Sequence, residues 1–143
     1  MAALYEEFPD AEALVSSHIR NDLSVNVYSS IPRSPTWPLI TVKRIGGTPA
    51  EKHHLDRAII QIDIWGGASG DDGTVNKGSI HDLAQSARVS IHEMEGSSTQ
   101  IGSGDDFHGY VTAVEDISGL FWLPDPTTGR DRYTFTVAVF LHG

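Results

Sequence analysis

Ile60-Gln61-Ile62-Asp63-Ile64-Trp65 (IQIDIW) carries the clearest pattern in this 143-residue sequence. Its isoleucines alternate with Gln61 and Asp63, and alternate side chains of an extended chain point to opposite faces. The segment Arg57–Trp65 is therefore predicted to be a strand whose isoleucine face lies in a core and whose other face is polar. The rest of the fold is placed around this strand.

Two shorter strands are predicted before it. Val25 and Val27 alternate with polar residues, and so do the apolar residues of Leu39–Ile45, where the paired glycines Gly46-Gly47 are expected to end the strand. The connector between these two strands is rich in proline, which cannot donate a backbone hydrogen bond to a sheet. We expect an extended connector without regular structure there.

Two amphipathic helices are predicted, one before and one after these strands. The first begins at Phe8-Pro9-Asp10, because proline and an acidic residue favour the first turn of a helix, and it runs to about Asn21. The second runs from about Thr74 to Glu95 and stops before Gly96, a favourable residue for a helix end. Its apolar stripe at helical spacing consists of Ile80, Leu83, Ala84, Ala87, Ile91 and Met94.

Two further strands close the chain, Tyr110–Ile117 and Arg132–Leu141. The order of elements is α-β-β-β-α-β-β, with the strands grouped rather than alternating with helices. Residues 1–143 are therefore predicted to form one α+β domain, a mostly antiparallel sheet of about five strands with two helices packed on it. The segments expected to be loops are Thr48–Leu55, Gly66–Gly73, Ser97–Asp106 and Ser118–Asp131.

The composition excludes several classes of function. The sequence has no cysteine, which rules out disulfides, thiolate nucleophiles and cysteine-ligated zinc. Its net charge of −9 does not suit the neutralisation of a nucleic-acid backbone, which draws on dense Lys and Arg. The acidic start lacks the pattern of a signal peptide, and no apolar run approaches the ~18 residues of a membrane span. We expect a soluble protein that has no membrane partner.

The seven histidines and the paired aspartates do not match a known catalytic or metal-binding pattern. His81 and His92 stand roughly 16 Å apart along the predicted helix, too far to share an ion. Asp71-Asp72 and Asp105-Asp106 lie in glycine-rich segments, but neither pair matches a calcium-binding loop, and solvated or helix-capping roles suffice for them. Nucleotide-binding glycine motifs and the nucleophile elbow are missing as well. No catalytic, cofactor-binding or metal-binding residue is predicted.

Large apolar residues occur in segments that are expected to be loops. Gly119–Pro126 (GLFWLPDP) contains Phe121 and Trp122, and Pro35–Pro38 contains Trp37. Apolar area left in water forfeits about 25 cal/mol per Å² of possible stabilisation. Each segment therefore either folds back over its own core or is buried against another subunit, where tryptophan is frequent at energetic hot spots. Both readings are open at this point.

Half of the basic residues lie between Arg33 and Arg57, a stretch that includes Lys43, Arg44 and Lys52. They form either a solvated face or a positive patch that meets an acidic neighbouring subunit. The candidates for contact with a subunit or another partner are Trp37, Arg44, Arg57, Asp71, Asp72, Asp105, Asp106, Phe121, Trp122 and Arg130.

A set of short motifs follows in order over residues 8–141: Phe8–Leu14 (FPDAEAL), Leu39–Gly47 (LITVKRIGG), Leu55-Asp56-Arg57, Ile60–Trp65, His81–Ala84 (HDLA), Leu123–Pro126 (LPDP) and the closing strand Arg132–Val139. In the order and spacing of these motifs the chain resembles the tail terminator family of long-tailed (siphovirus-type) bacteriophages, especially those of actinobacterial hosts. The segment Gly66–Gly73 is longer and richer in glycine than the family pattern requires, so no family contact is carried over onto it.

The resemblance implies an α+β subunit of a six-fold (homo-hexameric) ring, with no enzymatic activity and no cofactor. Such a ring sits on the last ring of major tail tube protein, stops tube growth and offers a surface to a head–tail connector or stopper protein. DNA only passes through the lumen, where an acidic wall lowers friction with phosphate. A basic stretch and acidic aspartate pairs suit head-to-tail contacts between copies. The implied location is the virion tail, assembled in the host cytoplasm.

Two other functions fit the same sequence. Another head–tail connector or head-completion protein of a phage would also be structural, but it would bind different neighbours. A small metal-dependent enzyme would use Asp105, Asp106 and His108.

Overall fold

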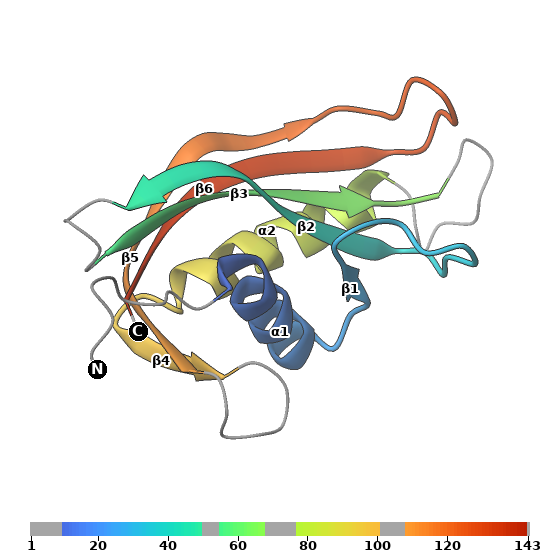
Figure 1. Ribbon diagram of the computed structural model, residues 1–143. Helices are drawn as coiled ribbons and strands as arrows, with labels where there is room; N and C mark the ends of the chain where they lie inside the picture. The colour runs from blue at the N-terminus through green and yellow to red at the C-terminus, as the bar shows by residue number, and fades with distance from the viewer. Residues whose placement is uncertain (1–9, 50–54, 68–76, 101–107, 143) are drawn as a thin grey trace.

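The fold is given by a computed structural model, which describes residues 10–49, 55–67, 77–100 and 108–142. Within these ranges two helices pack on one face of a six-stranded sheet (Figure 1). The α+β class, the grouping of the strands and the two helices on a mostly antiparallel sheet confirm the prediction from the sequence. One short strand in addition to the predicted set follows the second helix.

The sheet is built around β3 (Asp56–Trp65), the predicted isoleucine strand. β3 pairs antiparallel with β2 (Leu39–Pro49) on one side and with β6 (Arg132–His142) on the other, over its whole length in both ladders. Its backbone hydrogen-bonding groups are therefore used on both sides. The β3 side chains that are fully buried on the helix side include Ile60, Ile62 and Ile64.

The remaining strands extend the sheet on both sides. β1 (Val27–Tyr28) is parallel to β2, and β5 (His108–Trp122) is antiparallel to β6. β4 (Ser97–Gln100) pairs with the first part of β5. The strand order is β1-β2-β3-β6-β5-β4, so the short strands β1 and β4 cover only parts of β2 and β5.

The two helices are bounded by the kinds of residues that the sequence indicated. α1 (Ala11–Leu23) begins after Asp10, whose side chain accepts a hydrogen bond from a first-turn amide at 3.1 Å. It ends at Ser24, which adopts the left-handed conformation with φ 54°. α2 (Lys77–His92) is followed by a turn that reaches Gly96, with φ 78°. Both helices end close to the predicted positions.

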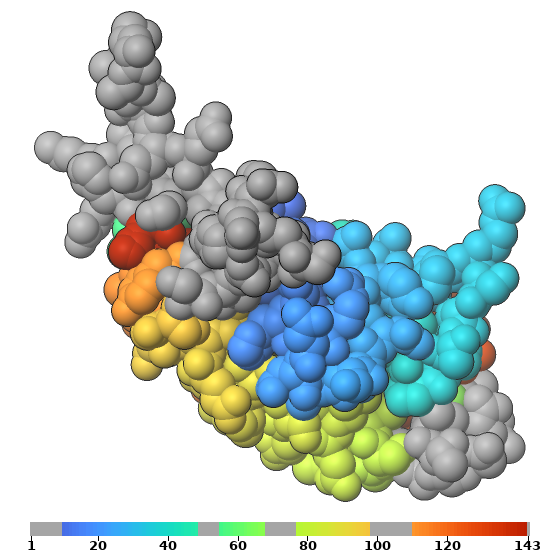
Figure 2. Space-filling view, turned by 90° about the horizontal axis from the view of Figure 1, so that it is seen from below, coloured from blue at the N-terminus to red at the C-terminus, as the bar shows by residue number. Residues whose placement is uncertain are grey.

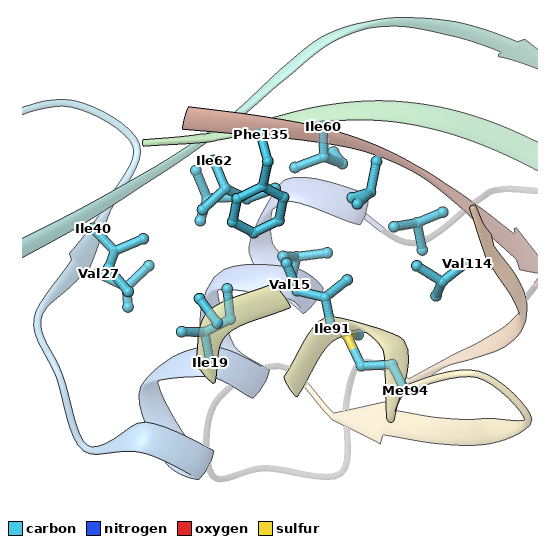
Figure 3. Close-up of a cluster of buried hydrophobic side chains, with 14 of the residues drawn as sticks. Val15, Ile19, Val27, Ile40, Ile60, Ile62, Ile91, Met94, Val114 and Phe135 are labelled. Atoms are coloured by element: carbon cyan, nitrogen blue, oxygen red, sulfur yellow. The ribbon is translucent and has the colours of Figure 1, made fainter. Parts of the chain in front are cut away.

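The core lies between the sheet and the two helices (Figure 3). Phe135 projects from β6 toward the helices, beside Ile62 of β3. The apolar stripes predicted for strands and helices thus meet in one core, in which each buried large apolar side chain stabilises the fold by about 1.5–3 kcal/mol. The helix side of this core includes Val15, Ile19, Ile91 and, just beyond α2, Met94.

β2 does not end at the paired glycines, as the sequence predicted, but continues to Pro49. A bulge between Arg44 and Gly46 shifts the register, and Gly47 then adopts φ 103°. A Cβ atom at Gly47 would lie 1.9 Å from the carbonyl oxygen of Arg57. The glycines therefore mark an irregular and crowded backbone within the strand, not its end.

Besides the start of Thr48–Leu55, two further segments predicted to be loops belong partly to the sheet. Ser97–Gln100 forms β4, and β5 continues past Ile117 to Trp122. The ladder between β5 and β6 has three register shifts, all within Val111–Phe121. Such bulges break the alternation of side chains, which is why the sequence pattern stopped too early.

Two glutamates cap the edges of the sheet. The Arg44 N–H of β2 donates to the Glu12 carboxylate of α1 at 3.0 Å, and the Val114 N–H of β5 donates to the Glu95 carboxylate at 3.0 Å. An exposed strand edge is a template for pairing with another chain, and charged groups and bulges at the edge oppose this pairing. Both sides of this sheet therefore carry features that disfavour edge-to-edge association.

Substitution of the two neighbouring glycines tests this backbone. Gly47→Ala is expected to lower the free energy of unfolding by about 1–3 kcal/mol or more. The alanine would have to adopt a positive φ, and its Cβ would collide with the Arg57 carbonyl. Gly46→Ala is expected to be tolerated, since its Cβ meets Ile59 at an ordinary 4.0 Å. Urea denaturation followed by circular dichroism measures both variants. An equal loss of stability in the two would contradict the bulge geometry.

Candidate functional site

Exposed apolar side chains line the second half of β5 and the residue after it. Ile117, Phe121, Trp122 and Leu123 are between 44% and 48% exposed, whereas Leu120 packs against the core. Leu120 therefore folds back over the core of its own chain, whereas Phe121 and Trp122 do not. The four exposed residues are named the β5 surface, and β5 is the orange strand of Figure 1.

Trp122 is held in place by two contacts. Its Nε1–H donates to Asp131 at 3.2 Å, and the Lys77 ammonium lies 3.8 Å from the ring centroid. A side chain that is already ordered loses little entropy when a partner covers it, so Trp122 suits the role of an interface anchor. The sequence did not indicate Lys77 or Asp131, because both contacts depend on where α2 begins and on how β5 pairs with β6.

All three tryptophans lie at the same end of the sheet, and each has a cation over its ring. Arg130 lies 3.9 Å from the Trp37 centroid and donates to a backbone carbonyl at 3.3 Å. Arg132 lies 4.8 Å from the centroid of Trp65, its partner in the ladder. The three tryptophans, Trp37, Trp65 and Trp122, together with Arg130 and Arg132 are named the tryptophan end. Two of the residues selected from the sequence, Trp37 and Arg130, are thus in direct contact.

A charged cluster ties β5 to α2. The Asp116 carboxylate accepts hydrogen bonds from Arg88 and, at 2.9 Å, from His92. The pKa of Asp116 is held below its ordinary value, mainly by the hydrogen bond from Arg88 and further by His92. Arg88 and His92 are four residues apart and share one side of α2. This spacing is the sequence signal that could have indicated an acidic partner.

Two other interface candidates make contacts within their own chain. Arg44 donates paired hydrogen bonds to Asp56 at 2.8 and 2.9 Å, and the Asp56 side chain is almost fully buried. The hydrogen bond to Asp56 is the main reason why the pKa of Arg44 is raised above its ordinary value. Arg57 lies 5.7 Å from the ring centroid of Phe140. Arg44 therefore stabilises the fold, and a contact with a partner stays a prediction for both arginines.

The aspartate pairs Asp71-Asp72 and Asp105-Asp106 lie outside the described residues. Within the described ranges, no group of three or more His, Asp or Glu side chains is arranged to hold a metal ion. No helix in that part of the chain combines the length and apolar composition needed to cross a membrane.

A comparison with solved structures finds the same fold in a virion. A chain in the virion of a native gene transfer agent particle has a TM-score of 0.56 and 12% sequence identity, over 93% of this chain and 95% of that chain. The sequence matches no protein-family model and no curated protein. At 12% identity the likeness is one of fold.

Replacing Asp116 by Asn tests the charged cluster. The pKa of Asp116 in the folded protein lies below its ordinary value of 3.8, so the unfolded chain binds the proton more readily. The resulting stabilisation is complete above that ordinary value and is lost as the pH falls through the lower, folded-state value. At about pH 7, Asp116→Asn is expected to lower the free energy of unfolding by about 0.5–1 kcal/mol, as for a partly exposed ion pair.

Denaturation curves between about pH 7 and about pH 2 measure this effect, and the two proteins should converge in stability toward acid. Glu115→Gln removes a neighbouring exposed carboxylate that has no partner in the described part of the chain, and it serves as the matched control. A stability difference of constant size across the pH range would contradict the ion-pair explanation.

Proposed function

We propose that this protein is a structural component of a phage-like virion, which forms a ring on the end of the tail tube. The ring ends tube polymerisation and provides the surface to which the head connector docks. The observation that carries the proposal is the β5 surface, four large apolar side chains that are nearly half exposed. Large apolar side chains that a folded chain leaves exposed mark candidate sites of association with other proteins.

The fold likeness supports a virion role. The similar chain belongs to the virion of a gene transfer agent particle, and the alignment extends over nearly all of both chains. The order of sequence motifs, which resembles the tail terminator family, supports the finer assignment to the tail end. The role of this chain is proposed from these two likenesses together with its own exposed surface.

A subunit of a stacked ring needs several unlike surfaces, because it has neighbours within the ring and others above and below it. The tryptophan end suits such a contact, since aromatic residues and arginine are enriched at the centre of protein interfaces. The β5 surface meets this end at Trp122 and extends along β5 to Ile117. We assign the β5 surface to the adjoining ring of tube protein and the rest of the tryptophan end to the connector protein.

Deleting the gene from the phage-like element that encodes the protein tests the function. Loss of a tail terminator is expected to give overlong tails of irregular length that do not join heads, as seen by electron microscopy. Tails of uniform length that fail to join heads would contradict tube termination and favour a connector or head-completion protein. Uniform tails that join heads normally would contradict both.

Variants of the β5 surface test the observation itself. Phe121→Ser and Trp122→Ser are each expected to weaken binding to isolated tail tubes roughly 30-fold, since loss of a hot-spot side chain costs about 2 kcal/mol. The fold should persist, because both side chains are nearly half exposed. Ile45→Ser removes a similarly exposed side chain from β2 and is the control. Co-sedimentation with tubes measures binding, and normal binding by a variant that carries both substitutions would contradict the proposed role of the β5 surface.

A further inference from the structure

The connector between β1 and β2, residues 29–38, presents an apolar and a basic side chain together. Figure 2 shows this segment, in light blue to cyan, projecting from the body of the molecule. Ile31 is 41% exposed, and Arg33 is exposed as well. Pro32 fixes its own φ and disfavours a helical conformation for Ile31, so these two exposed side chains lie two residues apart on a short extended segment.

Arg33 has no partner within the described part of its own chain. Apart from Arg33 and Lys43, each described lysine and arginine contacts a carboxylate, a carbonyl or an aromatic ring. A guanidinium carries five donors in a planar fork that fits carboxylates. The projecting segment therefore offers an unpaired cation to another molecule.

A groove of complementary chemistry lies between α1 and α2, which run side by side on the face seen in Figure 2. Its volume is about 390 Å³, within the about 300–1,000 Å³ of typical binding pockets. Leu23 and Val89 give it an apolar lining, and Val89 is 51% exposed. Asp22 and Glu93 also line it, and neither carboxylate has a partner among the described residues.

We propose that residues 31–33 of one copy insert into the α1–α2 groove of the next copy in the ring. Ile31 packs on the apolar lining, and Arg33 binds the two carboxylates. This inference rests on the proposed ring and names the contact between its subunits. Segment and groove are different parts of the chain, and such head-to-tail contacts generate a ring when the rotation between successive copies closes. Joining copies by strand addition is disfavoured by the glutamate caps and bulges at the sheet edges.

Disulfide trapping tests the contact without background, because the chain has no cysteine. Ile31→Cys is mixed with Val89→Cys, the ring is formed on isolated tail tubes, and the sample is oxidised with diamide. A disulfide requires Cβ atoms about 3.5–4.5 Å apart, so a covalent dimer on a non-reducing gel reports direct contact. A chain carrying both cysteines should give a ladder up to the closed ring. Ile45→Cys mixed with Val89→Cys should stay uncrosslinked.

Charge reversal gives an independent readout. Arg33→Glu is expected to weaken ring assembly about tenfold or more, because like charges then meet in the groove, and Glu93→Arg in the same chain should restore it. Rings that form normally in Arg33→Glu and give no crosslink between positions 31 and 89 would overturn this contact and leave the proposed function intact. If the unsubstituted protein forms no ring, alone or on tail tubes, both proposals fall.

Discussion

The fold depends on β3, a ten-residue strand that is paired on both sides while its isoleucine face is buried under two helices. A slip of one residue in either ladder would turn Ile60, Ile62 and Ile64 to the open face, so the register of β2 and β6 is fixed by the core. Within the described sheet, register shifts occur only in the β2–β3 and β5–β6 ladders, and β2 and β5 each have a stretch with a strand on one side only. The bulges and the two amides bonded by the glutamates lie on these two strands, and so do the exposed side chains of Ile45, Ile117, Phe121 and Trp122.

This division explains which elements could be predicted from the sequence. β3, α1 and α2 have unbroken periodicity, and their predicted bounds were close to the observed ones. The sequence pattern did not show that β5 continues past Ile117, because bulges interrupt the alternation of its side chains. Residues 118–119 have little strand preference of their own, and the chain stays in the sheet there because it pairs with β6. β4 consists of Ser97-Ser98-Thr99-Gln100 and has no apolar residue to reveal a strand. It belongs to the sheet only through its pairing with β5.

The candidate interaction sites could be predicted only as residue types. The sequence indicated that Trp37, Phe121 and Trp122 were unusual for their surroundings, but the contact of Trp37 with Arg130 joins segments that are distant along the chain. The groove between α1 and α2 has no sequence signature at all. Leu23 and Val89 each fit an ordinary helical pattern, and the hollow between them exists because of how the two helices lie against each other.

The distribution of charge bears on how copies of this chain associate. With a net charge of −9, free copies repel one another, and most described cations are already used within the chain. Association therefore depends on apolar burial, which acts only at contact, and on the few unpaired cations, whereas the net repulsion reaches about 8 Å at physiological salt. A template such as the end of the tail tube, which binds several copies side by side, overcomes this repulsion even when the contacts between the copies are weak. For the proposed ring, this balance favours assembly on the tube end over assembly in free solution.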